Sequence, residues 1–403
     1  MTGPRSQPNS EPWDLAIVGA GPAGTASALG ALHAQPDLRV LLLDRADFPR
    51  DKACGDGIAP HAVDVLAAVG VHGLLDDQMP VHRLELTHGE AKVSRAMKRP
   101  AYVVPRAEFD ARLLAAAVAA GAWFRRGRVR GVRAGSSAVA GEVAVDVAGA
   151  TTVRARTVIA ADGAHSVLRA AVSAAPGGRR VHTRPRTALA LRGYAPVQPA
   201  ARGRQRIVFG TRRQPAYAWS FDRGDGVANV GYGELLTGDG PAPSRVLLLA
   251  ELDRLLPGAG DDAEQWRGHH LPLSSWPWQQ PGGRILLAGD AAQLINPLTG
   301  EGIYYAVATG VLAGRCAVQS LRGQHCGADA GRLHRQAVRA LLGRHLLHTR
   351  VGASLVSRPA LVRAAVRAAA ADQRVFDDLV EVGLGRGCLT ASTVVAAVRE
   401  LST

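Results

Sequence analysis

Apolar and polar positions near the start of the chain predict a strand, a helix and a second strand in quick succession. Residues 14–18 (DLAIV) are mostly apolar, which is typical of a buried parallel strand. A glycine-rich turn (GAGPAG) follows at 19–24, and an Ala- and Leu-rich stretch to about His33 predicts a helix. Residues 39–44 (RVLLLD) predict a second strand that ends in a carboxylate. The pattern therefore predicts a βαβ unit at the start of the chain.

The glycines of this turn have the G-x-G-x-x-G spacing of a dinucleotide site. Gly19 would allow the tight turn, Gly21 would let the backbone approach a pyrophosphate, and Gly24 would let the helix pack closely on the strand. The helix N-terminus offers free N–H groups and partial positive charge to phosphates. Asp44 is placed to accept ribose hydroxyls. The glycine spacing alone is weak evidence for a dinucleotide site. Here a predicted strand precedes it, a predicted helix follows it, and the second strand ends in an acid, which strengthens the prediction.

The next part of the chain continues an α/β pattern. Apolar spacing predicts a helix over 60–70, strands over 81–104, a helix from about 105 and a β-meander over 123–149. A further buried strand over 153–159 should lie beside the first one.

The residue composition changes in the middle of the chain. Aromatic residues concentrate between about 183 and 278, where short strands alternate with glycine turns, so we expect a separate antiparallel sheet there. Residues 284–290 return to the pattern of the nucleotide-binding part. A second glycine-rich turn at 296–303 runs into a helix, and residues 331–403 read as helices.

Composition limits the classes of protein to consider. A chain of 403 residues with 47% hydrophobic residues and a mean hydropathy of +0.01 is expected to be globular, with two or three structural units. No apolar run approaches the ~20 residues of a transmembrane helix, and residues 1–12 lack the apolar segment of a signal peptide. The four cysteines show neither C-x-x-C spacing nor a nearby histidine cluster, which argues against zinc and disulfides and for the cytoplasm.

The net charge of +14 comes almost entirely from arginine, since Lys52, Lys92 and Lys98 are the only lysines. This charge fits either an arginine-rich solvated surface or attraction to an anionic membrane or substrate. Nucleic acid is not an expected partner, because aromatic residues make up only 4% and no nucleic-acid module is recognisable.

Three later segments are candidates for holding the rest of a dinucleotide cofactor. An acid after an apolar strand can bind a ribose or ribityl hydroxyl, and a glycine turn that opens a helix can direct N–H groups at a flavin ring. These segments contain Arg106, then Asp162, Gly163 and Ser166, and then Gly289, Asp290, Pro297, Gly300 and Gly302.

In this order and spacing, residues 13–320 resemble the para-hydroxybenzoate hydroxylase-like group of FAD enzymes, which bind FAD with matching G-x-G-x-x-G, D-G and G-D segments. The resemblance implies a Rossmann-like FAD-binding domain. The cofactor-binding residues that it implies are Gly19, Gly21, Pro22, Ala23, Gly24, Asp44, Arg45, Cys54, Gly55, Asp56, Gly57, Arg106, Asp162, Gly163, Ser166, Gly289, Asp290, Pro297, Gly300, Glu301, Gly302 and Ile303.

Two more motifs narrow the resemblance to geranylgeranyl reductases. Residues 48–57 (FPRDKACGDG) look like the P-x-x-x-x-C-G-x-G segment of that family, and 217–233 is similar to its Y-x-W-x-F-P…G-x-G signature. Asp222 stands where the signature has proline, and 372–380 resembles bacterial members. The family implies an FAD-dependent reductase that saturates isolated C=C bonds of prenyl chains in lipids, quinones or prenylated metabolites. NAD(P)H or another reductant would be the electron donor.

The substrate site is expected on the strand that carries Y-x-W-x-F. An isolated alkene accepts hydride poorly, so its reduction needs a proton donor and a site that excludes water. Alternation places three aromatic rings on one face of the strand, where they form either an apolar substrate wall or ordinary core. The substrate residues predicted are Tyr217, Trp219, Phe221, Gly231 and Gly233.

Cys54 and Asp56 are the catalytic candidates. The thiol of Cys54 would relay a proton or limit solvent near the flavin; otherwise Cys54 is a small residue in a glycine turn, with Arg50 and Lys52 solvated. Asp56 is either a turn residue or part of a proton relay. His165 is expected to be structural.

We expect an α/β fold with discontinuous domains. Residues 332–374 carry nine arginines among Leu, Val and Ala, so this segment either caps the core or rests on the inner face of a membrane. The predicted units are a disordered tail (1–12), an FAD-binding domain (13–80, 100–180 and 281–330), an antiparallel-sheet substrate domain (81–99 and 181–280) and a C-terminal helical region (331–403).

Other functions share parts of this pattern. An FAD monooxygenase that hydroxylates an aromatic or polyketide would have the same fold, since fold does not fix chemistry. A flavin halogenase is a weaker alternative, because no W-x-W-x-I-P motif is present. A flavin-binding or membrane scaffold without activity is the alternative of a different class. The expected partner is a prenyl lipid or prenylated small molecule, and the sequence does not indicate an oligomeric state.

Overall fold

A computed structural model describes residues 11–134, 141–174, 186–236, 241–323 and 329–401. The predicted disordered tail, apart from its last two residues, lies outside this range, as does Cys326.

The predicted βαβ unit is present at the start of the chain. It consists of β1 (Trp13–Val18), α1 (Pro22–Ala34) and β2 (Val40–Asp44). Strand β1 pairs in parallel with β2, where Leu15 lies opposite Val40. On its other side β1 pairs in parallel with β9 (Val153–Ala160), which confirms the predicted neighbour of the first strand. The carboxyl ends of these strands therefore meet at one edge of the sheet.

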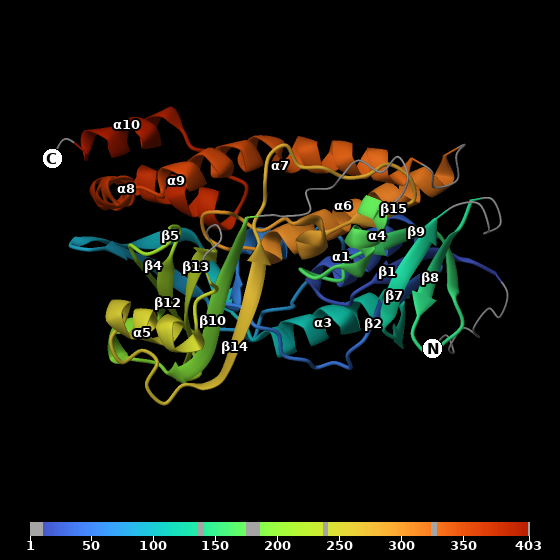
Figure 1. Cartoon of the computed structure of the whole chain (residues 1–403), viewed down its shortest axis with the longest axis horizontal. Coiled ribbons are helices and arrows are strands. Elements are labelled where there is room, and N and C mark those ends of the chain that lie inside the picture. The colour runs from blue at the N-terminus through green and yellow to red at the C-terminus, as the bar shows by residue number, and fades with distance from the viewer. Residues whose placement is uncertain (1–10, 135–140, 175–185, 237–240, 324–328, 402–403) are drawn as a thin grey trace.

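The first sheet has the strand order β6-β2-β1-β9-β8-β7, and β15 (Ile285–Leu287) also pairs with β9 (Figure 1). The short strand β6 (Trp123–Arg126) pairs in parallel with β2, whereas β7 (Val129–Ala134) and β8 (Val143–Val147) form an antiparallel hairpin on β9. The meander predicted over 123–149 is thus present for β7 and β8 but not for β6, which pairs in parallel with β2.

Helices cover this sheet and fix its loops. Helix α6 (Ile303–Arg322) packs along α1 so closely that a side chain would not fit at two of the glycines of α6. A Cβ added at Gly310 would lie 2.3 Å from the backbone oxygen of Ala23, and one at Gly314 would lie 2.1 Å from that of Ser27. The other helices in this part are α2 (Pro60–Ala67), α3 (Arg106–Ala119) and α4 (Val167–Ala174), and a short 3-10 turn spans Gly289–Ala292.

The second sheet has eight strands in the order β14-β10-β13-β12-β11-β4-β5-β3. This sheet contains strands from both regions in which strands were predicted, 81–104 and 183–278. The two regions meet where β4 pairs in parallel with β11, and the other pairs of the sheet are antiparallel. Strand β5 runs on through the predicted boundary at residue 99. The strands are β3 (Gly57–Ile58), β4 (Val81–His88), β5 (Ala91–Val103), β10 (Thr187–Pro196), β11 (Arg204–Phe209), β12 (Tyr217–Asp222), β13 (Val227–Leu236) and β14 (Glu264–Pro272), with a 3-10 turn at Pro199–Ala201.

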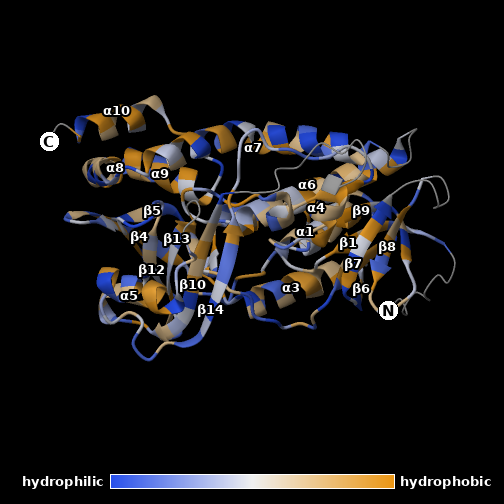
Figure 2. Ribbon diagram, viewed as in Figure 1, coloured by the Kyte–Doolittle hydropathy of each residue, from blue (hydrophilic) through white to orange (hydrophobic). Residues whose placement is uncertain are grey.

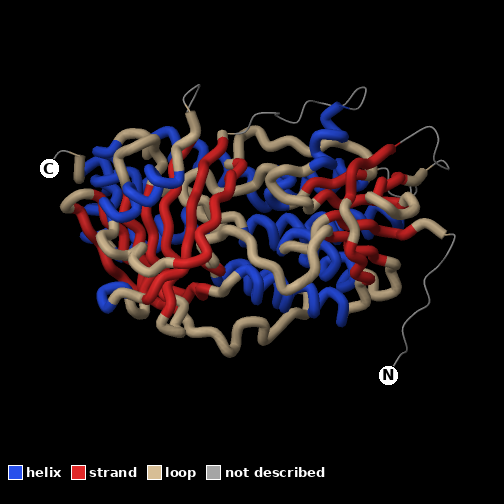
Figure 3. The backbone as a smooth tube through the Cα atoms, turned by 60° about the horizontal axis from the view of Figure 1, so that its bottom comes forward, coloured by secondary structure: helices blue, strands red, loops and turns tan. Residues whose placement is uncertain are grey.

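Helices lie on both faces of the second sheet. Helix α5 (Arg245–Leu255) packs under β10, β12 and β13, while the C-terminal helices lie on the opposite side (Figure 1). Figure 3 shows the strands of the two sheets, in red, at opposite ends of the molecule. Of these, α7 (Ala330–Leu355) packs on α6, and α8 (Pro359–Ala371) and α9 (Gln373–Leu384) pack on β5. Helix α10 (Ala391–Arg399) packs on α8 and α9, and Figure 2 shows apolar residues on it as well as on α8 and α9. The C-terminal region is therefore helical, as predicted.

Candidate functional site

A cavity of about 1440 Å³ runs from the glycine-rich turn after β1 to the space between the second sheet and the C-terminal helices. Most of the predicted site residues line it: Gly19, Gly21, Pro22, Ala23, Asp44, Arg45, Cys54, Gly55, Gly57, Arg106, Asp162, Gly163, Tyr217, Trp219, Phe221, Gly233, Asp290, Pro297, Gly300, Glu301, Gly302 and Ile303. Five predicted residues are not among the lining residues within the described chain, namely Gly24, Asp56, Ser166, Gly231 and Gly289.

The turn after β1 has the close contacts that its glycines predict. Gly19 has a φ of +102°, and a Cβ there would lie 2.2 Å from the oxygen of Ala161 on the neighbouring strand end. A Cβ at Gly24 would lie 1.7 Å from the oxygen of Gly19. Gly21 caps α1 without a side-chain acceptor, and Pro22 begins the helix. The first N–H groups of α1 therefore remain available to an anionic ligand.

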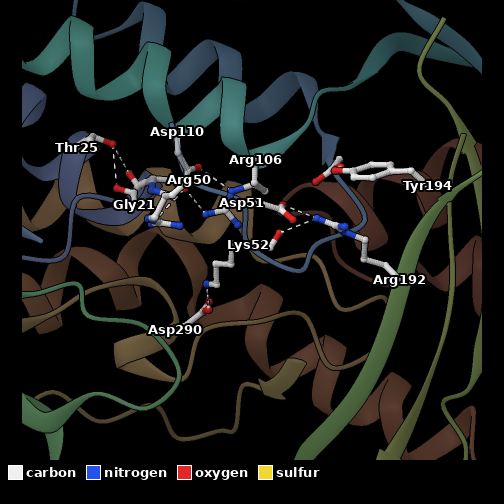
Figure 4. Close-up of polar contacts among 12 residues, drawn as sticks. Gly21, Thr25, Arg50, Asp51, Lys52, Arg106, Asp110, Arg192, Tyr194 and Asp290 are labelled. Atoms are coloured by element: carbon white, nitrogen blue, oxygen red, sulfur yellow. Dashed lines mark hydrogen bonds and ion pairs between the residues drawn. The ribbon is translucent and has the colours of Figure 1, made fainter. Parts of the chain in front are cut away.

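Two guanidinium groups stand over Gly21 (Figure 4). A Cβ at Gly21 would lie 3.2 Å from Nη2 of Arg50 and 3.9 Å from Nη2 of Arg106. Both arginines are held by buried Asp110, which accepts from Arg106 Nε at 2.7 Å and Nη2 at 2.8 Å and lies 3.3 Å from Arg50. Two cations against one carboxylate leave positive charge beside the turn, which suits a pyrophosphate. Sequence reasoning treated Arg50 as a solvated side chain and missed this position.

Two of the predicted ribose- or ribityl-binding acids also organise their own loops. Asp44 accepts the N–H of Ala20 at 2.8 Å through Oδ2 and that of Ala46 at 2.9 Å through Oδ1. Asp162 Oδ2 accepts the N–H of Val167 at 2.8 Å and so caps α4. Burial raises the pKa of Asp162, and its buried Oδ1 has no hydrogen-bond partner within the described residues. That oxygen is an acceptor that a cofactor hydroxyl would satisfy.

Ser166, the third residue of this predicted group, has a local partner. Its Oγ accepts the N–H of Arg169 at 2.9 Å, in the first turn of α4. The position is that of a helix-capping serine, and its predicted contact with the cofactor stays a prediction.

Asp290 lies at the junction between the first sheet and α6. Its Oδ2 is 3.2 Å from Nζ of Lys52 (Figure 4). Burial by itself would raise the pKa of Asp290, but Lys52, together with His269 and Arg106, lowers it below the usual value. Oδ1 of Asp290 would be 3.7 Å from a Cβ at Gly302, so this acid and the second glycine-rich turn meet.

The second glycine-rich turn is fixed by its own hydrogen bonds. The N–H of Asn296 donates to the backbone oxygen of Glu301 at 2.8 Å, and Oε1 of Glu301 accepts the N–H of Tyr304 at 2.7 Å, at the start of α6. Burial raises the pKa of Glu301 to about 7, although these helix N–H groups oppose the shift. The hydroxyl of Tyr217 donates to the backbone oxygen of Thr299, which ties the turn to β12.

The three aromatic residues of β12 share one face, as predicted. The ring centroids of Tyr217 and Trp219 are 5.9 Å apart, and those of Trp219 and Phe221 are 6.4 Å apart. A Cβ at Gly231 would lie 2.3 Å from Cζ2 of Trp219, so the indole lies directly over that glycine on β13. Aliphatic residues continue this wall toward the C-terminal helices: Leu84, Leu86, Ile207, Val362, Val366, Val380, Leu384, Val394 and Val398.

Asn229 on β13 connects the aromatic wall to the cysteine loop. Its Oδ1 accepts Nε1–H of Trp219 at 2.8 Å, and its Nδ2 donates to the backbone oxygen of Cys54 at 2.8 Å and to Oδ2 of Asp56 at 2.9 Å. Asn229 is fully buried. Sequence reasoning missed it, although an asparagine inside an apolar strand (VANV) is a signal of a buried polar contact.

The loop places Cys54 and Asp56 differently. Cys54 lines the cavity, and burial raises the pKa of its thiol despite nearby Arg106, so it is a neutral thiol at neutral pH. Asp56 is fully buried behind the wall, where it accepts the hydroxyl of Tyr194 at 2.6 Å. Burial raises the pKa of Asp56 to about 6, although the bonds from Tyr194 and Asn229 oppose the shift. The predicted catalytic role of Asp56 therefore has no direct contact with the cavity to support it.

A salt bridge fixes the same loop from its other side. Arg192 on β10 binds Asp51 and lies 4.3 Å over the ring of Tyr194 (Figure 4). His165, expected to be structural, lines the cavity and lies 6.4 Å from His269 and 6.1 Å from His270 between ring centroids.

A Rossmann-like sheet with two guanidinium groups at its first turn and a second glycine-rich turn at α6 defines a flavin-dependent oxidoreductase fold that accommodates FAD. Residues 13–193 match the model of the family described as FAD binding domain. The chain belongs to the geranylgeranyl reductase family of FAD-dependent oxidoreductases.

Two relatives support the assignment. The menaquinone reductase of Mycolicibacterium smegmatis is 35% identical over 315 residues, which cover 74% of this chain and 75% of the relative. Digeranylgeranylglycerophospholipid reductase 1 of Methanopyrus kandleri is 32% identical over 329 residues, 77% of this chain and 81% of the relative.

Solved structures show the same fold. A geranylgeranyl bacteriochlorophyll reductase-like protein of Thermoplasma acidophilum superposes with a TM-score of 0.77 at 22% identity, over 97% of this chain and 96% of the other. A flavin-dependent brominase reaches a TM-score of 0.68 at 16% identity, over 97% and 99%. At these identities the likeness concerns the fold and not the reaction.

Proposed function

We propose that this protein is an FAD-dependent reductase that saturates isolated C=C bonds in the prenyl chain of a quinone or lipid. The observation that carries the proposal is the continuity of one cavity from the dinucleotide-binding turn to the aromatic and aliphatic wall under the C-terminal helices. At about 1440 Å³ it exceeds the roughly 300–1,000 Å³ of an ordinary ligand pocket, as expected for a site that takes a dinucleotide and a long apolar chain. The relatives named for menaquinone and for digeranylgeranylglycerophospholipid support this substrate class.

The residues of the site suit reduction of an unactivated alkene. FAD bound at this site and reduced by the electron donor would supply the hydride. The wall of Tyr217, Trp219 and Phe221 excludes water and presents ring faces that tolerate developing positive charge on the chain. The neutral thiol of Cys54 gives the proton to the other carbon of the double bond and regains one from solvent before the next turnover.

The residues at the other end hold the cofactor. Arg50, Arg106 and the first N–H groups of α1 bind the diphosphate, while Asp44, Asp162 and Asp290 accept hydroxyls. The N-terminus of α6 presents its positive end to the flavin.

Two finer points belong to the same proposal. NAD(P)H is the electron donor. It reaches the flavin only transiently, so the chain needs no second G-x-G-x-x-G motif to hold the nicotinamide cofactor. The protein also contacts the anionic surface of a membrane, where prenyl lipids reside. No described helix is long and apolar enough to span a membrane.

The test is an anaerobic half-reaction. The purified FAD-loaded protein is reduced with NADH or NADPH and mixed with menaquinone or with a digeranylgeranylglycerol phospholipid. We expect flavin reoxidation together with a mass gain of two hydrogens per bond reduced. Unchanged lipid masses with every substrate, from a protein that binds FAD and is fully reduced, would rule the proposal out.

The alternative of an FAD monooxygenase rests on the fold that this chain shares with a flavin-dependent brominase and with a halogenase that binds FAD. Repeating the assay in air separates the two functions. A reductase consumes oxygen at a rate that the prenyl substrate does not raise, whereas a monooxygenase shows substrate-dependent oxygen uptake and a product heavier by one oxygen atom.

A further inference from the structure

The cavity extends to residues of the C-terminal helices α7 and α10. In Figure 1 the end of the molecule that carries α8, α9 and α10 lies away from β1 and the glycine-rich turn that follows it. Three apolar residues line the cavity there and are also exposed: Leu355 at the end of α7 by 40%, and Val394 and Val398 on α10 by 47% and 55%. An apolar side chain that both lines a cavity and faces solvent marks its mouth.

The rim of this mouth is apolar beyond the lining residues. On α7, Leu347 and Val351 precede Leu355 at intervals of four residues, so the three exposed side chains form an apolar stripe. Val395 and Leu401 add to the exposed apolar residues on and just after α10. Among the described residues, seven of the eleven exposed large hydrophobic side chains lie on or just beyond these two helices. Single exposed hydrophobic residues are ordinary, but a group of this size marks an interaction surface.

On the side of the mouth formed by α7 and α8, the charge has one sign. Residues 330–371, which include α7 and α8, contain eight arginines and no aspartate or glutamate. Arg344, Arg358 and Arg363 are exposed and make no ion pair within the described chain. The N–H of Arg358 donates to the backbone oxygen of Leu355 at 3.0 Å, so a cation sits at the rim itself. Apolar residues beside unpaired arginines match the headgroup region of an anionic bilayer.

We propose that the face formed by α7, the start of α8 and α10 rests on an anionic lipid bilayer, and that its mouth admits the prenyl chain directly from the membrane. The surface stands on its own observations, while the passage of a prenyl chain rests on the function proposed above. Exposing such a chain to water is unfavourable in proportion to its apolar area, so direct transfer between bilayer and cavity avoids a large barrier.

Vesicle sedimentation with the FAD-loaded full chain tests the surface. We expect binding to vesicles of phosphatidylcholine mixed with phosphatidylglycerol and much weaker binding to phosphatidylcholine alone. The double variant V351D/V395D changes exposed rim residues that do not line the cavity, and should bind the mixed vesicles at least about tenfold less well. V246D is the matched control, because Val246 is 76% exposed on α5, on the opposite side of the sheet. It should bind like the wild type.

Charge and transfer are tested separately. R358E and R363E should each weaken binding to the mixed vesicles by about fivefold or more and leave binding to phosphatidylcholine nearly unchanged. V351D/V395D should also slow reduction of vesicle-embedded substrate while retaining the rate with detergent-dispersed substrate. Retained flavin absorbance and melting temperature show that each variant is folded.

The outcomes separate the two proposals. Equal vesicle binding by the wild type and V351D/V395D, or no binding by either, overturns the bilayer surface. A wild-type dimer that V351D/V395D dissociates without lipid assigns this face to a second copy of the chain, and also overturns it. If wild type reduces no prenyl substrate in detergent but vesicle binding follows the expected pattern, the proposed reductase activity fails and the bilayer surface stands.

Discussion

The indole nitrogen of Trp219 lies 2.8 Å from the side-chain oxygen of Asn229, and this bond links the aromatic wall of β12 to the residue that also holds the cysteine loop. The amide nitrogen of the same asparagine holds the backbone oxygen of Cys54. The orientation of the indole and the position of the loop are therefore set by one buried carboxamide.

Replacing the carboxamide of Asn229 should lower turnover and stability more than it lowers the affinity for FAD. Asn229→Ala leaves an indole N–H and a loop carbonyl unpaired in a buried place, at about 1–3 kcal/mol each. We expect a lower melting temperature and a fall in turnover of at least about tenfold, with FAD affinity within a few-fold of wild type. Trp219→Phe is the control, because it keeps both bonds from Asn229 to the loop and should leave the melting temperature closer to wild type. Wild-type turnover in Asn229→Ala would contradict the positioning role.

Gly231 should tolerate no side chain. A Cβ there would meet Cζ2 of Trp219 and the backbone oxygen of Leu191, each at 2.3 Å. Gly231→Ala should therefore displace the indole, shift the tryptophan fluorescence and lower stability by about 1–3 kcal/mol. Gly131 on β7 has open space around its missing Cβ, so Gly131→Ala should change neither signal. Equal melting curves for the two variants would refute the close packing.

The pair Arg106 and Asp110 allows a structural role to be separated from a cofactor role. Arg106→Met leaves the Asp110 carboxylate buried with only Arg50 nearby, which should cost about 3–5 kcal/mol. The double variant Arg106→Met/Asp110→Leu should recover much of that stability in chemical unfolding. If Arg106 binds the diphosphate, FAD affinity measured by flavin fluorescence stays reduced in the double variant. Recovery of both properties would show that the pair is purely structural.

Cys54 should matter for the chemical step. Cys54→Ala removes the proposed proton donor, so reoxidation of the reduced flavin by prenyl substrate should slow by roughly 10²–10⁴-fold in rapid mixing. Flavin content should be unchanged. Cys316→Ala is the matched control, since Cys316 is a buried cysteine on α6 that does not line the cavity. Wild-type reoxidation in Cys54→Ala would remove the thiol from the mechanism.

Asp56 should make stability depend on pH. Burial raises the pKa of Asp56 to about 6 in the folded chain, against an ordinary value of about 3.9. The folded state thus favours the protonated carboxyl, whose stabilising contribution is full below about pH 4 and is lost as the pH rises through about 6. The stability of wild type relative to Asp56→Asn should fall by up to about 3 kcal/mol over this range. A pH-independent difference between the two unfolding curves would contradict the raised pKa.

Local sequence patterns predicted much of the fold. The apolar runs of β1 and β2 and the glycine spacing between them predicted the βαβ unit at the start of the chain. A glycine turn with this spacing is compatible with few other backbone conformations. The parallel neighbour of β1 was also predicted, and the alternation in β12 placed Tyr217, Trp219 and Phe221 on one face.

The features that sequence reasoning missed all depend on contacts between distant segments. Asn229 is an ordinary residue until β13 brings it beside the loop of Cys54. Arg50 looks like a surface arginine until Asp110 of α3 turns it toward Gly21. Likewise, no periodic pattern in the sequence predicts that β4 pairs in parallel with β11 or that α10 forms part of the cavity wall.

The glycine contacts between α1 and α6 have a consequence for cofactor choice. Each helix begins at one of the two glycine-rich turns, and their backbones touch at Gly310 and Gly314. The distance between the two turns is therefore fixed by this contact between helices. If the first turn binds the diphosphate and the second the flavin, as proposed, a mononucleotide such as FMN is too short to reach both, so even a large excess of FMN should not replace FAD.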